Sequence, residues 1–257
     1  MNTRQTTNLP LEVKNVTIRF GNETVIERVS FVVRPQETVV LMGPSGEGKT
    51  VLLKAMAGII PVDEGQVFIE GKDWQTLNSH NRRQLAKKVG MLFQKSALFD
   101  EMSCAENIAF PLKEHTRLKD EEIHERVVDF LRRVGLSEAY EKLPHELSGG
   151  MQKRLGIARA LALSPEIVFY DDPTAGQDPI TSDKIIDLIE ELKIENRSTL
   201  VVVTNDIKCA YRLADRIIIV VNKSIIDSGS VAQTKNSVDP RVKQFIAGEL
   251  TGPLTHN

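Results

Sequence analysis

The chain has 257 residues, of which 41% are hydrophobic and 26% charged, and its formal net charge is −2. These values are typical of a globular protein with one large or two small domains, and they give no general attraction to nucleic acid. The longest apolar run, residues 217–221, is far shorter than the ~20 residues that span a bilayer, so we expect any membrane role to act through a partner.

Two further features concern the compartment in which the chain works. Cys104 and Cys209 lack the spacing of a metal site, which favours free thiols in a reducing environment. Residues 1–8 are polar and contain no apolar core of a signal peptide. We therefore expect a protein of the cytoplasm.

The first region, residues 9–35, alternates apolar and polar side chains over two segments that Gly21-Asn22 separates. This pattern predicts an antiparallel hairpin. Phe20 stands directly before the turn, and two interpretations are open for it. The ring stacks on an adenine base, or it is an ordinary core aromatic.

A glycine-rich loop of the form G-x-x-x-x-G-K-S/T follows the apolar segment 39–42 and precedes a helical segment, 51–57. Such a loop turns its backbone N–H groups inward at a helix N-terminus, which makes a cradle for a polyphosphate. Lys49 is predicted to reach the β- and γ-phosphates and Thr50 to ligate Mg²⁺. An ordinary strand-to-helix turn is the alternative, but the flanking strand and helix disfavour it. The predicted nucleotide-binding residues here are Gly43, Pro44, Ser45, Gly46, Glu47, Gly48, Lys49, Thr50 and Val51.

The middle of the chain first alternates short strands and helices and then becomes helical. Strands are predicted at 67–69 and 89–93, the second delivering Gln94, with a charged helix at 78–88 between them. Residues 103–163 are helical in character. Ser148-Gly149-Gly150 opens the last of these helices, which is predicted to end near residue 163. Ser148 suits a helix cap, but two glycines weaken the first turn unless another group approaches that backbone closely.

Polar residues follow two all-apolar strands in the last third of the chain. Residues 167–170 lead to Asp171-Asp172, and residues 199–204 lead to Asn205. Strands rich in Val and Ile that alternate with helices predict a parallel sheet covered on both faces. The phosphate loop and these two groups should therefore converge on one sheet edge. Residues 217–221 and 224–227 predict a closing hairpin, and the chain turns polar from residue 238.

Together these residues resemble the ATP-binding subunits of ABC transporters over nearly the whole chain. The resemblance depends on the phosphate loop, Gln94, the segment 147–152 and the strand that ends at Asp171-Asp172-Pro173. It implies an α/β P-loop NTPase fold with a mostly parallel core sheet, an N-terminal antiparallel β subdomain and a helical subdomain at about 95–163. We expect one domain, 9–240, and a C-terminal tail, 241–257.

The resemblance also implies the division of labour at the site. Lys49 and the loop amides hold the phosphates of ATP, and Phe20 stacks on the adenine. Mg²⁺ is implied to lie between Thr50, Gln94 and Asp171. Two copies enclose two ATP molecules, so that Ser148, Gly149 and Gly150 of one copy touch the γ-phosphate held by the other. Closure of this dimer drives a membrane permease.

Two positions depart from the family pattern. Asp172 stands where Glu usually polarises the attacking water, which sets its carboxylate back by roughly 1 Å, and such misplacement can lower a rate by about 10²-fold. Asn205 stands where His usually reaches the γ-phosphate, and its amide donates a hydrogen bond without taking up charge. We expect intact nucleotide binding and slow hydrolysis by Asp172, Asn205, Gln94 and Lys49. A regulatory nucleotide clamp with a nearly silent site is the alternative.

Three further stretches resemble the ATPase subunits of Mla-type phospholipid transporters: 97–99 with 107–112, 176–181 and 239–245. This implies a subunit on the cytoplasmic face of the inner membrane, with a permease, an MCE-domain lipid-binding protein and a small accessory subunit as partners. The tail then crosses to the second copy, and a disordered end is the other interpretation. A third hypothesis is an ABC ATPase of DNA repair or translation, which one cassette without coiled-coil heptads or a basic tract disfavours.

Overall fold

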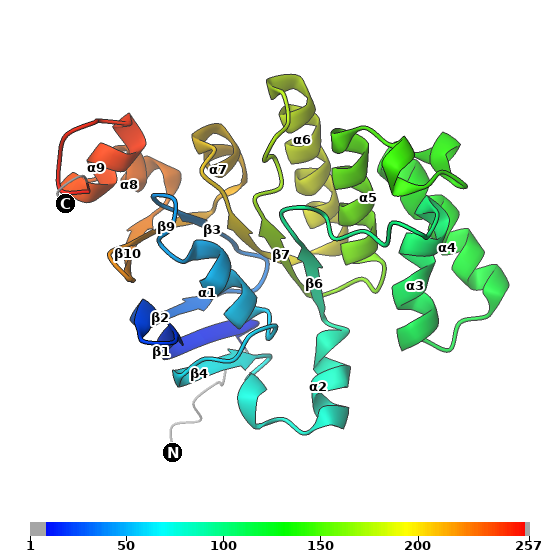
Figure 1. Cartoon of the computed structure of the whole chain (residues 1–257), viewed down its shortest axis with the longest axis horizontal. Helices are drawn as coiled ribbons and strands as arrows, with labels where there is room; N and C mark the ends of the chain where they lie inside the picture. Colours follow the sequence, from blue (N-terminus) through cyan, green and yellow to red (C-terminus); the bar gives the residue numbers. More distant parts are fainter. Residues whose placement is uncertain (1–8, 255–257) are drawn as a thin grey trace, which may run out of the picture.

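The structure, a computed structural model, describes residues 9–254. The polar segment 1–8 and the last three residues of the predicted tail lie outside that range. Nine α-helices are found in the described part of the chain (Figure 1), in chain order α1 (Lys49–Met56), α2 (Ser79–Ala86), α3 (Cys104–His115), α4 (Asp120–Arg133), α5 (Gly149–Leu161), α6 (Pro179–Asn196), α7 (Ile207–Leu213), α8 (Val231–Lys235) and α9 (Pro240–Ala247). Within residues 9–254, no helix combines the length and the apolar character needed to cross a bilayer.

The strands form two sheets. The antiparallel sheet has the order β2-β1-β4-β5 and contains the predicted hairpin, from strands β1 (Leu11–Phe20), β2 (Glu23–Val33), β4 (Glu64–Ile69) and β5 (Lys72–Asp73). The second sheet has the order β10-β9-β3-β8-β7-β6 and is parallel except for its edge strand β10. Its strands are β3 (Thr38–Met42), β6 (Val89–Leu92), β7 (Ile167–Asp171), β8 (Thr199–Val203), β9 (Arg216–Val221) and β10 (Ser224–Gly229). The predicted fold class is confirmed.

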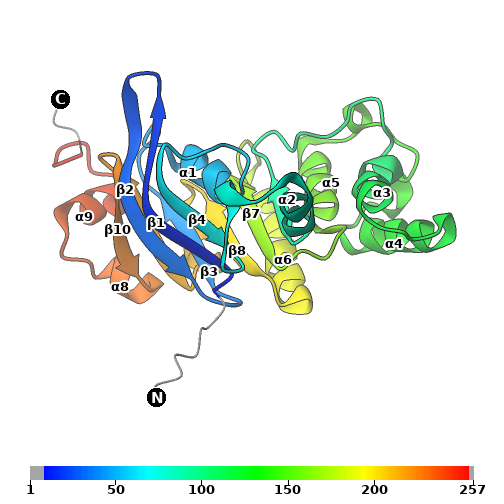
Figure 2. The ribbon, with the colours of Figure 1, turned by 90° about the horizontal axis from the view of Figure 1, so that it is seen from below.

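The six-stranded sheet is the middle layer of the molecule, because successive side chains of each strand face opposite sides. From β3, Val39 and Leu41 pack toward α1 and the antiparallel sheet. Val40 and Met42 pack into the other core, which contains the buried faces of α3 to α7. Figure 2 shows α3 and α4 at one end of the molecule, away from the antiparallel sheet, and α8 and α9 at the opposite end. The central strands β3, β7, β8 and β9 are buried on both faces, as their continuous apolar sequences predict.

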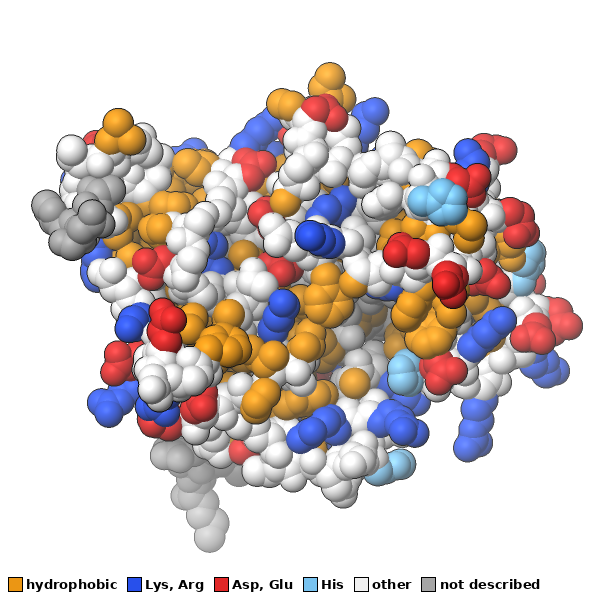
Figure 3. Space-filling model, in the orientation of Figure 1, with side chains coloured by type: hydrophobic (Ala, Val, Ile, Leu, Met, Phe, Trp, Pro, Cys, Tyr) orange, Lys and Arg blue, Asp and Glu red, His pale blue; other side chains and the backbone are white. Residues whose placement is uncertain are grey.

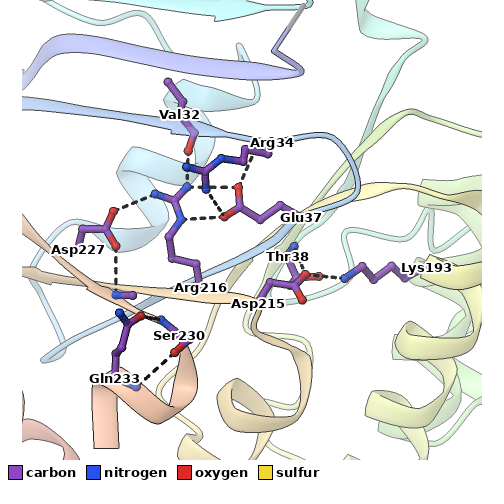
Figure 4. Close-up of polar contacts among 11 residues, drawn as sticks. Val32, Arg34, Glu37, Thr38, Lys193, Asp215, Arg216, Asp227, Ser230 and Gln233 are labelled. Atoms are coloured by element: carbon purple, nitrogen blue, oxygen red, sulfur yellow. Dashed lines mark hydrogen bonds and ion pairs between the residues drawn. The ribbon is translucent and has the colours of Figure 1, made fainter. Parts of the chain in front are cut away.

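An ion-pair network joins the two sheets near the start of β3, as Figure 4 shows. The Arg216 guanidinium on β9 donates to Glu37 Oε1 at 2.8 Å, to Asp227 Oδ2 on β10 at 2.9 Å and to the carbonyl of Val32 on β2. Both Arg216 and Glu37 are largely buried. Partial burial makes these charge-assisted hydrogen bonds stronger than an exposed ion pair, so the network fixes the antiparallel sheet against the edge of the parallel one.

The helical layer and the C-terminal segment complete the fold. α4 has acidic residues in its first turn and arginines in its last turn, which suits the helix dipole, and Gly135 follows it at φ 66°. The stretch after residue 238 forms α9. Its Val242 is fully buried in the core that contains α3 to α7. The Leu254 N–H donates to Gln244 Oε1 at 2.7 Å, so the chain folds back on α9. That the tail crosses to a second copy stays a prediction.

Candidate functional site

The loop between β3 and α1, residues 43–48, has the backbone that its glycines predict. Gly43 lies at φ 139°, and a Cβ there would stand 2.1 Å from the Val220 carbonyl oxygen. Gly48 is the N-cap of α1 at φ 85°, without a side-chain cap. Both positions require glycine, because a side chain would clash or would be strained in the left-handed region. The N–H groups at the start of α1 are therefore free of side-chain competition.

Lys49 is the first residue of α1 and is only 7% exposed. Its ammonium donates to the carbonyl oxygens of Gly43 at 2.7 Å and Pro44 at 2.6 Å. Burial lowers the pKa of Lys49, while the carboxylates of Glu47, Asp172 and Asp171 act to raise it. The lysine is thus held over its own loop as a desolvated cation, where it attracts an anion strongly.

The carboxyl ends of the neighbouring strands β3, β8 and β7 meet at one edge, as the sequence predicts. Together with the end of β1 they enclose a cavity of about 520 Å³, which we call the strand-end pocket. The predicted site residues that line it are Phe20, Ser45, Gly46, Gly48, Lys49, Thr50, Val51, Gln94, Asp171, Asp172 and Asn205. Gly43, Pro44 and Glu47 belong to the same loop without lining the pocket.

Two of the groups predicted to hold a metal, the Thr50 hydroxyl and the Asp171 carboxylate, are already in contact. Thr50 Oγ1 donates to Asp171 Oδ1 at 2.7 Å, and Gln94 lines the same pocket as these two residues. Oxygen donors of this kind, few in number, are what Mg²⁺ takes when a substrate's phosphates supply further ligands. The residues present therefore fit a magnesium ion.

Asp172 has an unusual backbone for the end of a strand. Its φ is 50°, in the left-handed region, and its N–H donates to the Val203 carbonyl at 2.8 Å. Burial raises the pKa of its carboxyl, while the hydrogen bond from Thr204 Oγ1 at 3.3 Å and the charge of Lys153 oppose that rise. Because Asp adopts this region more readily than Glu, the backbone gives a physical reason for the shorter side chain.

Asn205 and Phe20 both line the strand-end pocket. Asn205 Nδ2 donates to Ser45 Oγ at 3.4 Å, so its amide is directed at the loop. Phe20 is 56% exposed at the end of β1, which excludes the core interpretation. Its ring lines the strand-end pocket together with Val25. Stacking of this ring on a base stays a prediction.

The segment Ser148–Gly150, which we call the Ser-Gly-Gly turn, lies at the start of α5 and outside the strand-end pocket. Ser148 Oγ caps the helix by accepting the Met151 N–H at 3.3 Å. A Cβ on Gly150 would stand 2.5 Å from Thr181 Cγ2 on α6, so packing within the chain explains this glycine. Ser148 and Gly149 remain exposed. Their backbone is open to another molecule.

Comparison with known proteins agrees with this geometry. Residues 26–175 match the family model described as ABC transporter. The chain is 38% identical, over 95% of its length and 92% of the relative's, to the intermembrane phospholipid transport system ATP-binding protein MlaF of Haemophilus influenzae. This chain belongs to the ABC transporter family.

Further relatives of this ABC cassette extend the comparison. The probable ribonucleotide transport ATP-binding protein mkl of Mycobacterium tuberculosis is 36% identical over 95% of the chain and 68% of that protein. The structure of the dimeric ATP-binding cassette MJ0796 in a post-hydrolysis state with ADP and Pi aligns with a TM-score of 0.78. The two chains are 32% identical, and the alignment covers 84% of this chain and 98% of the MJ0796 chain. The predicted resemblance is confirmed, and the chain is an ABC ATPase.

Sequence reasoning missed several residues of the site. Glu23 and Val25 line the strand-end pocket from β2. Lys153 on α5 is 5% exposed, and its ammonium donates to the backbone carbonyls of Gln94 and Asp172. From the sequence alone, a lysine within a helix is expected to be a solvated charge on the surface. The signal that could have revealed it is its spacing, four residues after Gly149 among small and apolar residues.

Proposed function

We propose that this ABC cassette binds and hydrolyses ATP as one of two copies that drive a membrane permease for phospholipid. The transport substrate is inferred from the MlaF relative of Haemophilus influenzae, which is named for intermembrane phospholipid transport and matches 95% of this chain. The observation that carries the ATPase proposal is the meeting of a buried cationic loop with two strand-end carboxylates in one pocket. A triphosphate and its magnesium ion need both.

Each group in the strand-end pocket has a proposed task. Lys49 and the N–H groups at the start of α1 bind the phosphates. Thr50, Asp171 and Gln94 hold Mg²⁺, which when bound neutralises charge that develops on the phosphates. Asp172 orients the attacking water, and Asn205 donates a hydrogen bond toward the γ-phosphate. The work of these residues is positioning and charge stabilisation, as phosphoryl transfer requires.

Two features favour slow hydrolysis. Asp172 has a shorter reach than Glu and a backbone in the left-handed region, and the Asn205 amide stays neutral. The alternative function, a regulatory nucleotide clamp, depends on the same two residues. It predicts ATP-driven dimerisation with almost no phosphate release, whereas the transporter ATPase releases phosphate in every closing cycle.

A second copy of the chain is the partner we propose for the Ser-Gly-Gly turn. Ser148 and Gly149 are exposed at a helix N-terminus, where backbone N–H groups and the helix dipole favour a phosphate. The turn stands outside its own strand-end pocket. It can therefore complete only a nucleotide that another copy holds, as the dimeric relative MJ0796 suggests.

The permease is proposed to dock in an apolar groove of about 360 Å³ between the parallel sheet and the helical layer. Phe99 and Phe110 are 40% and 37% exposed there, and their ring centroids lie 4.8 Å apart. Figure 3 shows hydrophobic side chains exposed over the α3 region of this face. Exposed aromatic clusters of this kind mark protein interfaces. We place the complex on the cytoplasmic face of the inner membrane, with an MCE-domain protein and a small accessory subunit.

Co-purification after mild detergent extraction tests this proposal, combined with phosphate release from the recovered complex. We expect a polytopic membrane protein and an MCE-domain protein in the complex, and ATP-dependent phosphate release that EDTA abolishes. Recovery of the chain without any membrane protein would contradict the transporter role. A Phe110→Asp variant should lose the permease while the isolated chain retains ATP binding, and Phe68→Asp on β4, away from the groove, is its control.

A further inference from the structure

Lys153 connects helix α5 to two segments that line its own strand-end pocket. Its ammonium donates to the Gln94 carbonyl, which follows β6, and to the Asp172 carbonyl at 3.3 Å, which follows β7. The side chain is 5% exposed. A buried ammonium has to satisfy its donors, because an unpaired one is strongly destabilising. These hydrogen bonds therefore fix the distance between α5 and the two loops.

The two acceptors are segments whose position matters for the reaction. Asp172 holds a left-handed φ of 50°, and the backbone after Gln94 has two more such residues, Ser96 at 59° and Ala97 at 47°. Backbone in these sparsely populated regions persists only where its surroundings hold it. Lys153 supplies part of that support from one point between the loops.

The N-terminal end of α5 is exposed at the surface. The Ser-Gly-Gly turn is about one helical turn before Lys153 and, in the proposed dimer, contacts the ATP of the second copy. We propose that Lys153 is a positioning residue that transmits engagement of this turn to Gln94 and Asp172 of its own site, and so couples the two ATP sites. The inference rests on the proposed function, since it requires the ATP-bound dimer.

A matched control lies next to Lys153 on the same helix. Arg154 donates from Nε to the Val134 carbonyl at 2.9 Å, in the helical layer and away from the strand-end pocket. Burial lowers the pKa of both cations. Substituting Met for either residue removes a cation that donates to a backbone carbonyl. Of the two residues, only Lys153 contacts the segments at Gln94 and Asp172.

The experiment measures phosphate release against ATP concentration for the full-length protein and its Lys153→Met, Lys153→Arg and Arg154→Met variants. Equilibrium binding of a fluorescent ATP analogue and thermal melting are measured alongside. For Lys153→Met we expect kcat to fall about 10-fold or more, because small displacements of reacting groups have effects of that size. Affinity for the analogue should change less than about 3-fold, since the phosphate cradle is intact.

Cooperativity separates coupling from local support. We expect a wild-type Hill coefficient between 1 and 2, a value near 1 for Lys153→Met, and substantial recovery of both kcat and cooperativity in Lys153→Arg, which keeps the donors. Arg154→Met should melt at a lower temperature with unchanged cooperativity.

Three results would overturn the inference: unchanged kcat and cooperativity in Lys153→Met, equal loss of cooperativity in Arg154→Met, or a wild-type Hill coefficient of 1. If Lys153→Met does not fold, Lys153→Gln, which keeps an amide donor, has to show the same loss of cooperativity to a smaller degree. A wild-type protein without ATP turnover would instead remove the proposed function itself.

Discussion

Two helix N-termini of this cassette contain glycines and present them differently. At α1, Gly48 caps the helix with a left-handed backbone, and Lys49 is buried over the loop inside the strand-end pocket. At α5, the Ser148 hydroxyl caps the helix, and Ser148 and Gly149 lie exposed on the surface. In the proposed dimer, the first terminus binds phosphates within its own chain and the second offers the same N–H chemistry to another copy. Under that proposal neither terminus forms the whole ATP site alone.

The largest effect is expected at the first terminus. Lys49→Ala removes the buried cation, and we expect phosphate release to fall by about 10²–10³-fold, the loss typical of a deleted preorganised donor. Lys54→Ala, on the last turn of the same helix, should stay within about 2-fold of the wild type, because surface changes away from a site have small effects. Equal losses in both variants would show that the loop does not bind the phosphates.

The second terminus is tested by Ser148→Arg, which fills the exposed turn. We expect ATP-driven dimerisation to disappear and turnover to fall by about 10²-fold, since reacting groups then lose their alignment. Loss of the cap alone lowers stability by about 1 kcal/mol. Ser230→Arg at the N-cap of α8 is the control, since it also loses a capping serine. Light scattering and phosphate release on both variants decide the point, and equal behaviour would contradict the role of the turn.

A smaller change is expected at Asp172. In Asp172→Glu the longer side chain regains reach toward the water, and we expect turnover to rise by up to about 10-fold. The left-handed backbone should make the same variant less stable by about 1 kcal/mol, seen as a lower melting temperature. An Asp172→Glu variant with unchanged turnover and melting temperature would refute both geometric arguments.

The smallest effect is expected at the edge of the first terminus, where Phe20 lines the pocket. Because the Phe20 ring is 56% exposed, its loss in Phe20→Ala should weaken ATP binding by about 1 kcal/mol, or roughly 5-fold in Kd. Phe20→Tyr keeps a ring and should bind as the wild type does. Inorganic triphosphate is the control ligand, because it has no base to stack. Calorimetry that finds equal weakening for ATP and triphosphate would exclude stacking.

The sequence predicted the parts of the fold that local patterns determine. Alternation gave the β1–β2 hairpin, apolar runs gave the core strands, and the polar residues after them gave the convergence of Lys49, Asp171 and Asn205 on one edge. A capping pattern placed the start of α5 at Ser148. Such features depend on a few neighbouring residues, which is why they can be recognised without the structure.

The features that escaped prediction depend on contacts between distant segments. Lys153 meets Gln94 and Asp172 only because α5 packs between their strands and the helical layer. The left-handed backbone of Asp172 is stabilised by Val203 and Thr204 of the neighbouring strand region. Likewise, α9 mixes apolar and charged residues in a stretch that the sequence predicts only to turn polar. Burial of Val242 in the core that contains α3 to α7 gives this helix a partner that local sequence does not reveal.

Complementation between two inactive variants tests most directly the claim that one copy's ATP is completed by the other. In a mixture of Lys49→Ala with Ser148→Arg, each heterodimer contains one site with both an intact Lys49 and an intact Ser-Gly-Gly turn. We predict phosphate release at least about 5-fold above either variant alone, because that one site regains all its donors. The double variant mixed with wild type gives heterodimers without an intact site and serves as the control. Folded variants that stay inactive after mixing would contradict the account.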